Sequence, residues 1–116
     1  MLETGNWGEE QAVNFLLSKG YLILKRNYRF QKAEIDIVAQ KENTIVAVEV
    51  KTRIGKAIQA PFCAINKAKQ RNLIKAINWF SQKWTTPMEV RMDAISVVKC
   101  GEEIIIEHLE DAFPAF

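Results

Sequence analysis

Two runs of branched apolar residues flank a short polar turn in the first half of the chain. Residues 34–40 and 44–51 are rich in Ile and Val, and Lys41-Glu42-Asn43 separates them. Branched residues favour β-strands, and a polar segment this short between two such runs is typical of a β-hairpin. Because side chains alternate between the two faces of a strand, the register of this hairpin decides which side chains meet.

Charged side chains interrupt both apolar runs. Asp36 lies in the first run, and Glu49 and Lys51 lie in the second. If the loop has two or four residues, Asp36 faces Glu49, with Cβ atoms about 5 Å apart. A loop with an odd number of residues would shift the register by one and place the two carboxylates on opposite faces. We predict the even register.

Two carboxylates at this spacing repel each other unless a cation lies between them. Mg²⁺ and Mn²⁺ prefer oxygen ligands, and such an ion can orient water and polarise a phosphate oxygen. Lys51, on the same face as Glu49, can position the attacking water and stabilise negative charge. Asp36, Glu49 and Lys51 therefore predict a metal-dependent phosphodiesterase site. The alternative is a solvated face with ordinary ion pairs, Glu34 with Lys51 and Asp36 with Arg53.

A first helix is expected to begin at Thr4 or Asn6 and to end near Gly20. At 100° per residue, Glu9 projects into the apolar stripe of this helix, whereas Glu10 projects toward its edge. An acid on the core-facing side needs a metal or a cation as its partner. Glu9 is therefore predicted to complete the site, directly or through water. Its alternative role is to complement the helix dipole.

The remaining chain predicts one strand before the hairpin and a helix and two strands after it. We expect a strand over 21–30, a loop over 52–64, a helix from Asn66 to about Trp84, a strand over 88–99, a turn at Cys100-Gly101 and a strand over 103–108. No repeat or linker divides the chain, so residues 1–116 are expected to form a single domain. The order of elements predicts an α/β/α sandwich with a central mixed sheet.

Positive charge is concentrated in the first 99 residues. All sixteen Lys and Arg lie there, whereas the last seventeen residues hold five acids and no Lys or Arg. On the expected second helix, Lys67 and Arg71 lie one turn apart, away from its apolar face. Lys51, Arg53 and Lys56 lie on the segment before it. These side chains could bind phosphates that flank the scissile bond, or they could form a solvated surface.

The composition, 48% hydrophobic and 26% charged residues, is that of a globular domain. No apolar run approaches the roughly 20 residues needed to span a bilayer, and the N-terminus lacks the features of a signal peptide. We therefore expect a cytoplasmic protein without a membrane partner. Cys63 and Cys100 are expected to be small core residues. Arg91 and Asp93 are expected to form a structural pair, and His108 is not expected to be catalytic.

The motifs, in this order, resemble the YraN family of small bacterial endonuclease-like proteins. The resemblance covers essentially the whole chain and rests on Gly8-Glu9, Arg26-Asn27, Glu34-Ile35-Asp36, Glu49-Val50-Lys51-Thr52-Arg53, Pro61, Lys67, Arg71 and Arg91-Met92-Asp93. One departure is Ala33, because the family usually has Gly before the Glu-Ile-Asp motif. A Gly there would permit a positive φ.

The resemblance implies a restriction-endonuclease-like fold of the PD-(D/E)XK type, related to Holliday-junction resolvases. It implies a Mg²⁺- or Mn²⁺-dependent endonuclease acting on DNA rather than RNA, with branched or single-stranded DNA as expected substrates. Carried over by residue, the metal ligands are Asp36, Glu49 and the Val50 carbonyl, Lys51 is the catalytic lysine and Glu9 is the helix acid. Thr52, Lys67 and Arg71 fall at family positions near the site, where they would contact phosphate.

Two other functions remain compatible with the sequence. The first is a nucleic-acid-binding protein that has the endonuclease-like fold but does not cut, which the basic portion of the chain favours. The second is a protein-interaction domain whose acidic C-terminal segment contacts a partner. The sequence also leaves homodimerisation open.

Overall fold

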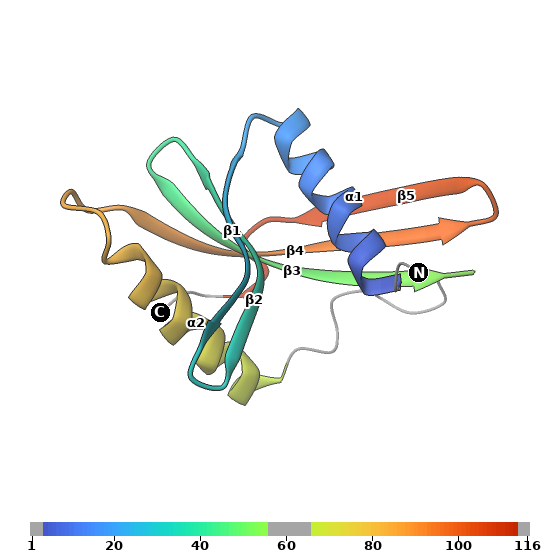
Figure 1. Cartoon of the computed structure of the whole chain (residues 1–116). Helices are drawn as coiled ribbons and strands as arrows, with labels where there is room; N and C mark the ends of the chain where they lie inside the picture. The colour runs from blue at the N-terminus through green and yellow to red at the C-terminus, as the bar shows by residue number, and fades with distance from the viewer. Residues whose placement is uncertain (1–3, 56–65, 114–116) are drawn as a thin grey trace.

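The computed structural model describes residues 4–55 and 66–113. The elements follow in the order α1 (Thr4–Ser18), β1 (Leu22–Phe30), β2 (Ala33–Lys41), β3 (Thr44–Ile54), α2 (Lys67–Ser81), β4 (Glu89–Cys100) and β5 (Glu103–Leu109). The five strands form one sheet in the order β1-β2-β3-β4-β5, in which β3 and β4 are parallel and the other neighbours are antiparallel. The two helices cover opposite faces of this sheet (Figure 1). The predicted α/β/α sandwich with a central mixed sheet is confirmed.

Two apolar cores, one on each face of the sheet, hold the helices in place. On the α2 face, Leu73, Ala76, Ile77 and Phe80 pack against sheet residues that include Ile45, Ala47 and Met92. On the α1 face, Ala12, Val13 and Leu16 pack against Val46, Val48, Ile95 and Val97. The middle of β3 is therefore apolar on both sides, as expected for a strand inside a covered sheet.

Local signals set most of the helix ends as predicted. α1 ends at Ser18, and Gly20 follows with a φ of +90°, a conformation that glycine adopts without strain. The side chain of Asn66 caps α2 by accepting a hydrogen bond of 2.8 Å from the backbone N–H of Lys69. The predicted extension of this helix to Trp84 is wrong. The α-helix ends at Ser81 and gives way to tighter turns with i→i−3 hydrogen bonds.

The sequence also misplaces the end of β3. A loop was expected from residue 52, but Thr52, Arg53 and Ile54 continue the parallel pairing with Val97, Val98 and Lys99 of β4. Parallel pairing of this kind joins segments distant in the chain, so no local pattern reports it. The rest of the expected loop lies almost entirely in residues 56–65, outside the described residues.

Cys100 is exposed at the end of β4, so its expected place in the core is wrong. Cys63 lies outside the described residues. Ala33 begins β2 without a positive φ, and the left-handed conformation falls instead on Gln31, in the turn before it. No helix in the described part of the chain is long and apolar enough to cross a membrane.

Candidate active site

The β2–β3 hairpin has a two-residue loop, so the predicted even register is confirmed. Lys41 pairs with Thr44, and the ladder continues as far as the pair of Ile37 and Val48. The next position along this register brings Asp36 and Glu49 together. Because the loop is even, the two carboxylates meet instead of lying on opposite faces of the sheet.

β2 and β3 separate directly after the Ile37–Val48 pair, and Asp36 lies at the point of separation. Its Oδ2 accepts a hydrogen bond of 2.8 Å from the backbone N–H of Val50. A side chain thus takes the place of the main-chain acceptor that a continuing strand would supply. Ile35 and Val38 both pack on the α2 face, which shows that the regular alternation of β2 is interrupted around Asp36.

The carboxyls of Asp36 and Glu49 are hydrogen-bonded to each other in this arrangement. Burial, together with the hydrogen bond and the negative charge of Glu49, raises the pKa of Asp36 to about 8. Burial would also raise the pKa of Glu49, but the hydrogen bond from Asp36, the nearby Lys69 and the charge of Lys51 lower it. Protonated Asp36 therefore donates to ionised Glu49. The alternative ion pair with Arg53 is not formed by Asp36.

Lys69, which the sequence did not single out, reaches Glu49 from α2. Its Nζ lies 2.7 Å from Glu49 Oε2, an ion pair in which the buried carboxylate oxygen still lacks a well-aligned hydrogen bond. The positions of apolar residues along the helix could have identified Lys69. It precedes the buried Leu73 and Phe80 by four and eleven positions, so it lies on the same face of α2 as they do. Glu9 was selected because it is a charged residue on the apolar face of a helix, and Lys69 meets the same criterion.

Glu9 turns inward and Glu10 turns outward, as helix phase predicted. The side chain of Glu9 is 14% exposed and that of Glu10 is 51% exposed. Arg26 of β1 holds both, with Nη1 2.6 Å from Glu10 Oε1 and Nη2 3.7 Å from Glu9 Oε1. The charge of Glu9 also reaches Asp36, where it contributes to the raised pKa. Arg26 is thus a second residue of this site that spacing alone did not reveal.

The donor set fits a divalent cation bound by few protein ligands. Glu9 Oε1 and Glu49 Oε2 are buried without a hydrogen bond, and Asp36 carries a proton that a cation would displace. Among the described residues, no three His, Cys, Asp or Glu side chains converge into a metal cage. Mg²⁺ does not require one, because it is commonly held by one or two carboxylates together with water and substrate phosphate.

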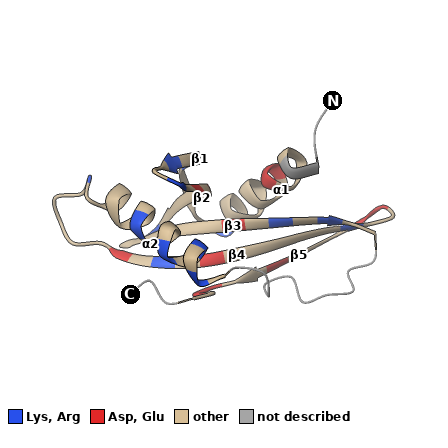
Figure 2. Cartoon of the chain, turned by 90° about the horizontal axis from the view of Figure 1, so that it is seen from below, with Lys and Arg blue, Asp and Glu red and all other residues tan. Residues whose placement is uncertain are grey.

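The predicted phosphate-binding residues divide between two regions. Lys67 and Arg71 are exposed on α2, and the blue segments of this helix in Figure 2 mark its Lys and Arg positions. Arg53 follows Lys51 on β3 and is half-buried. Thr52 instead packs against Gly8 of α1, so closely that a Cβ at Gly8 would overlap its side chain. Lys56 lies outside the described residues.

Glu34 does not pair with Lys51. Its carboxylate lies 3.2 Å from Nε of Arg29, directly across the β1–β2 pair. The alternative interpretation of Lys51 as a surface residue required an ion pair with Glu34, and that pair is absent from the described contacts. Lys51 is left beside Glu49, whose pKa it lowers.

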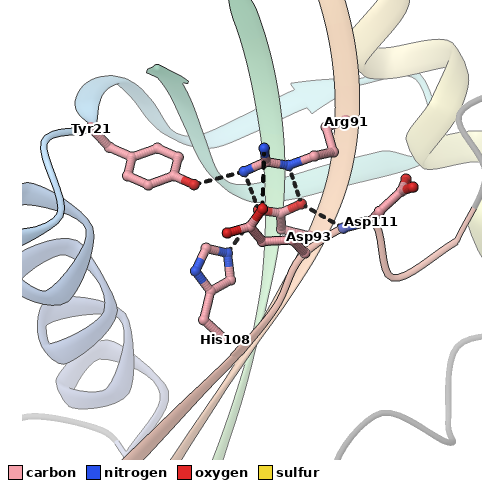
Figure 3. A network of polar contacts seen from close by, with 6 residues as sticks. Tyr21, Arg91, Asp93, His108 and Asp111 are labelled. Carbon is pink, nitrogen blue, oxygen red and sulfur yellow. Dashed lines mark hydrogen bonds and ion pairs between the residues drawn. The ribbon is translucent and has the colours of Figure 1, made fainter. Parts of the chain in front are cut away.

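A separate buried network surrounds Asp93 on the α1 face (Figure 3). Arg91 binds both carboxylate oxygens, with Nε 2.8 Å from Oδ1 and Nη2 2.9 Å from Oδ2. His108 Nε2 lies 2.7 Å from Oδ2, and the backbone N–H of Asp111 donates to Oδ1 at 3.0 Å. Arg91 also donates to the Tyr21 hydroxyl at 2.6 Å. The network confirms the expected Arg91–Asp93 pair and joins β4 to the chain after β5.

The mixed sheet between two helices is an α/β sandwich, and this architecture is consistent with an endonuclease-like fold. Residues 8–97 match the family described as "Uncharacterised protein family UPF0102", and the chain belongs to this family, the YraN family of the resemblance. A UPF0102 protein of Flavobacterium psychrophilum is 47% identical over 98% of this chain and 96% of the relative. Those of Christiangramia forsetii and Syntrophotalea carbinolica are 42% and 38% identical, over 96% and 97% of this chain and 93% and 92% of the relatives.

Proposed function

We propose that this protein is a Mg²⁺- or Mn²⁺-dependent endonuclease that acts on DNA. One observation carries the proposal: the half-buried carboxyl of Asp36 and the buried carboxyl of Glu49 are hydrogen-bonded to each other at the point where β2 and β3 separate. Burying two carboxylates side by side destabilises a fold, and strongly shifted pKa values of this kind gather at functional sites. Asp36, Glu49 and the Val50 carbonyl are the proposed metal ligands, with Glu9 acting directly or through water.

A divalent ion held there would activate a water molecule and neutralise charge on the scissile phosphate. Lys51 lies beside Glu49, where its ammonium group can orient the attacking water and offset the charge that develops on the phosphate. Arg26 keeps Glu9 and Glu10 in place from β1. The carboxylates of Glu9 and Glu10 are therefore already in position before the substrate binds.

The start of α2 supports a role in binding phosphates. Lys67, Lys69 and Arg71 lie within its first five residues, and its first turn contains no acid. The N-terminal end of a helix carries partial positive charge, so each of these cations costs up to about 1 kcal/mol. Bound phosphate groups would offset the repulsion between these cations and the helix end, because both the helix end and the side chains attract phosphate.

Cleavage of a panel of DNA substrates tests the proposal. Purified protein is incubated with flap, junction, single-stranded and duplex DNA in Mg²⁺ or Mn²⁺, beside Glu49→Ala and the control Glu102→Ala at an exposed turn residue. We expect cleavage that requires the metal, is lost in Glu49→Ala and is retained in Glu102→Ala. Equal cleavage by Glu49→Ala, or no cleavage of any substrate by the parent protein, would remove the catalytic proposal.

A second candidate is a nucleic-acid-binding protein that does not cut, which the Lys69–Glu49 ion pair favours. The ammonium group of Lys69 already supplies a positive charge beside the carboxylates without any metal. This function predicts binding that is independent of metal and weakens steeply with salt. It also predicts weaker binding by Lys67→Ala/Arg71→Ala. Parent-like affinity of that double variant at low salt would count against it.

A further inference from the structure

A groove runs along α2, between this helix and the turn that joins β1 to β2. A pocket of about 340 Å³ lies between residues 32–34 of the turn and the first half of α2. A second pocket of about 460 Å³ lies between residues 30–31 and the second half of the helix. On the turn and on the helix alike, a residue that lines the first pocket is the sequence neighbour of a residue that lines the second pocket. The two pockets therefore lie end to end along α2, and together they are called the groove.

Five residues on the helix wall of the groove form one stripe: Ala68, Asn72, Lys75, Trp79 and Gln82. The remaining residues of this wall lie beside the stripe and are Asn66, Lys69, Leu73, Ile74 and Asn78. The five stripe positions are separated alternately by four and three residues, which places them on one face of the helix. The stripe contains a cation, two amides and an aromatic ring but no acid. Its composition is that of a binding surface rather than of a core-facing stripe.

The aromatic end of the groove is Trp79, whose side chain is 56% exposed. The indole ring stacks on Phe30 of the opposite wall, with ring centroids 5.4 Å apart and ring planes 27° apart. Phe30 thus fixes the orientation of the indole and leaves much of its surface open to solvent. An oriented, open ring beside a lysine is the arrangement on which unpaired bases stack in proteins that bind single strands.

The other end of the groove meets the candidate active site. Lys69 lines the first pocket and also lies 2.7 Å from Glu49 Oε2. Lys69 and Trp79 are ten positions apart, or about 15 Å along the helix axis. Lys32 on the turn wall and Lys75 on the helix wall supply positive charge to the groove. Glu34 also lines the turn wall, where its carboxylate is paired with Arg29 at 3.2 Å.

We propose that this groove binds a single strand of DNA and leads it to Asp36 and Glu49. One base stacks on Trp79, and the backbone phosphates lie along Lys75, Lys32 and Lys69. A base paired within a duplex cannot offer its face to Trp79, so the groove selects an unpaired strand. This inference rests on the proposed function and gives it a substrate class: DNA that is single-stranded next to the cut.

Binding to a fluorescently labelled oligo-dT strand tests the inference. Anisotropy is measured in a metal chelator, so that no cleavage interferes, with a duplex of the same length as a competitor. We expect Trp79→Ala to bind the single strand about tenfold more weakly than the parent protein, a typical effect of losing one stacked base. Trp79→Phe, which retains an aromatic face, should recover most of the affinity. Leu17→Ala shortens another exposed apolar side chain, on α1, and should bind like the parent.

Two results would overturn the inference: parent-like binding by Trp79→Ala, or a duplex that binds more tightly than the single strand. Thermal melting of each variant separates a loss of binding from a loss of folding. Because the assay needs no catalysis, it can be read apart from the cleavage panel. Glu49-dependent cleavage with parent-like binding by Trp79→Ala would refute the groove alone. Weakened binding by Trp79→Ala without any cleavage by the parent would refute the nuclease and leave the groove as a binding site.

Discussion

Asp36→Asn is expected to stabilise the metal-free protein, although it removes a proposed metal ligand. The pKa of Asp36 is about 8 in the folded protein against an ordinary value of 3.8. At pH 7, folding must therefore place a proton on this carboxyl, which costs about 4 kcal/mol for a group acting alone. The lowered pKa of Glu49 recovers part of that cost, because the two groups share the proton. We expect a net gain of about 1–3 kcal/mol from the substitution.

The amide of an asparagine fits the site without a new unsatisfied group. Its oxygen can accept from the Val50 N–H, as Asp36 Oδ2 does, and its NH₂ group can donate to Glu49. The gain should depend on pH in a defined direction. Below about pH 4, both folded and unfolded Asp36 hold the proton, so the substitution should be nearly neutral. The gain should then grow as pH rises toward 8 and level off above it.

Urea unfolding in a metal chelator, followed by circular dichroism at several values between about pH 4.5 and 8, measures this dependence. Asp93→Asn is the matched control, because the same substitution acts there on a carboxyl with the opposite shift. Burial would raise the pKa of Asp93, but hydrogen bonds from His108, Arg91 and the Asp111 N–H lower it. Its stabilising effect is present above the ordinary carboxyl pKa and is lost as pH falls through the lowered value.

Asp93→Asn should therefore destabilise the protein at neutral pH by about 3–5 kcal/mol, the usual cost of breaking a buried charge pair. The reasoning fails if Asp36→Asn and Asp93→Asn destabilise alike at pH 7. It also fails if the effect of Asp36→Asn does not change between acidic and neutral pH. Either result would mean that the carboxyl of Asp36 is not held protonated in the folded protein.

Three further predictions concern the proposed metal site and the packing of α1. Lys69→Ala should bind Mn²⁺ severalfold more tightly than the parent in an electron paramagnetic resonance titration, because no ammonium group then competes for Glu49, whereas Lys67→Ala should not. Mn²⁺ affinity of the parent should rise with pH up to about 8, as Asp36 loses its proton, and a flat profile would exclude that competition. Gly8→Ala should lower the free energy of unfolding by about 1–3 kcal/mol through overlap with Thr52, and adding Thr52→Ala should recover part of the loss.

The parts of the site that came from strict periodicity were predictable from the sequence. An even-numbered hairpin loop, of two or four residues, was predicted within residues 34–51, and the pairing of Ile37 with Val48 confirms that register. Helix phase separated inward Glu9 from outward Glu10 for the same reason. Both are local rules, in which a short stretch of chain carries its own geometric information.

Contacts between distant segments were not predictable in this way. Arg26 reaches Glu9 and Glu10 from another element, and no spacing rule connects them. The extension of β3 to Ile54 depends on its partner β4, which follows α2 in the chain. Trp79 is a further case: aromatic residues on helices usually lie in the core, but Trp79 lies outside the buried stripe of α2 and is exposed.

The sheet order gives the acidic end of the chain a role of its own. β5 is an edge strand, and it exposes Ile105 and Leu109 beside Glu103 and Glu107. Among the described residues, no strand pairs with the outer edge of β5. Main-chain groups along such an edge can pair with a strand from another copy, and adjacent apolar side chains would strengthen that association. Like-charged acids on both approaching strands oppose it. We therefore expect these glutamates to reduce edge-to-edge aggregation of the protein. The positively charged residues that could bind phosphates lie on other parts of the molecule.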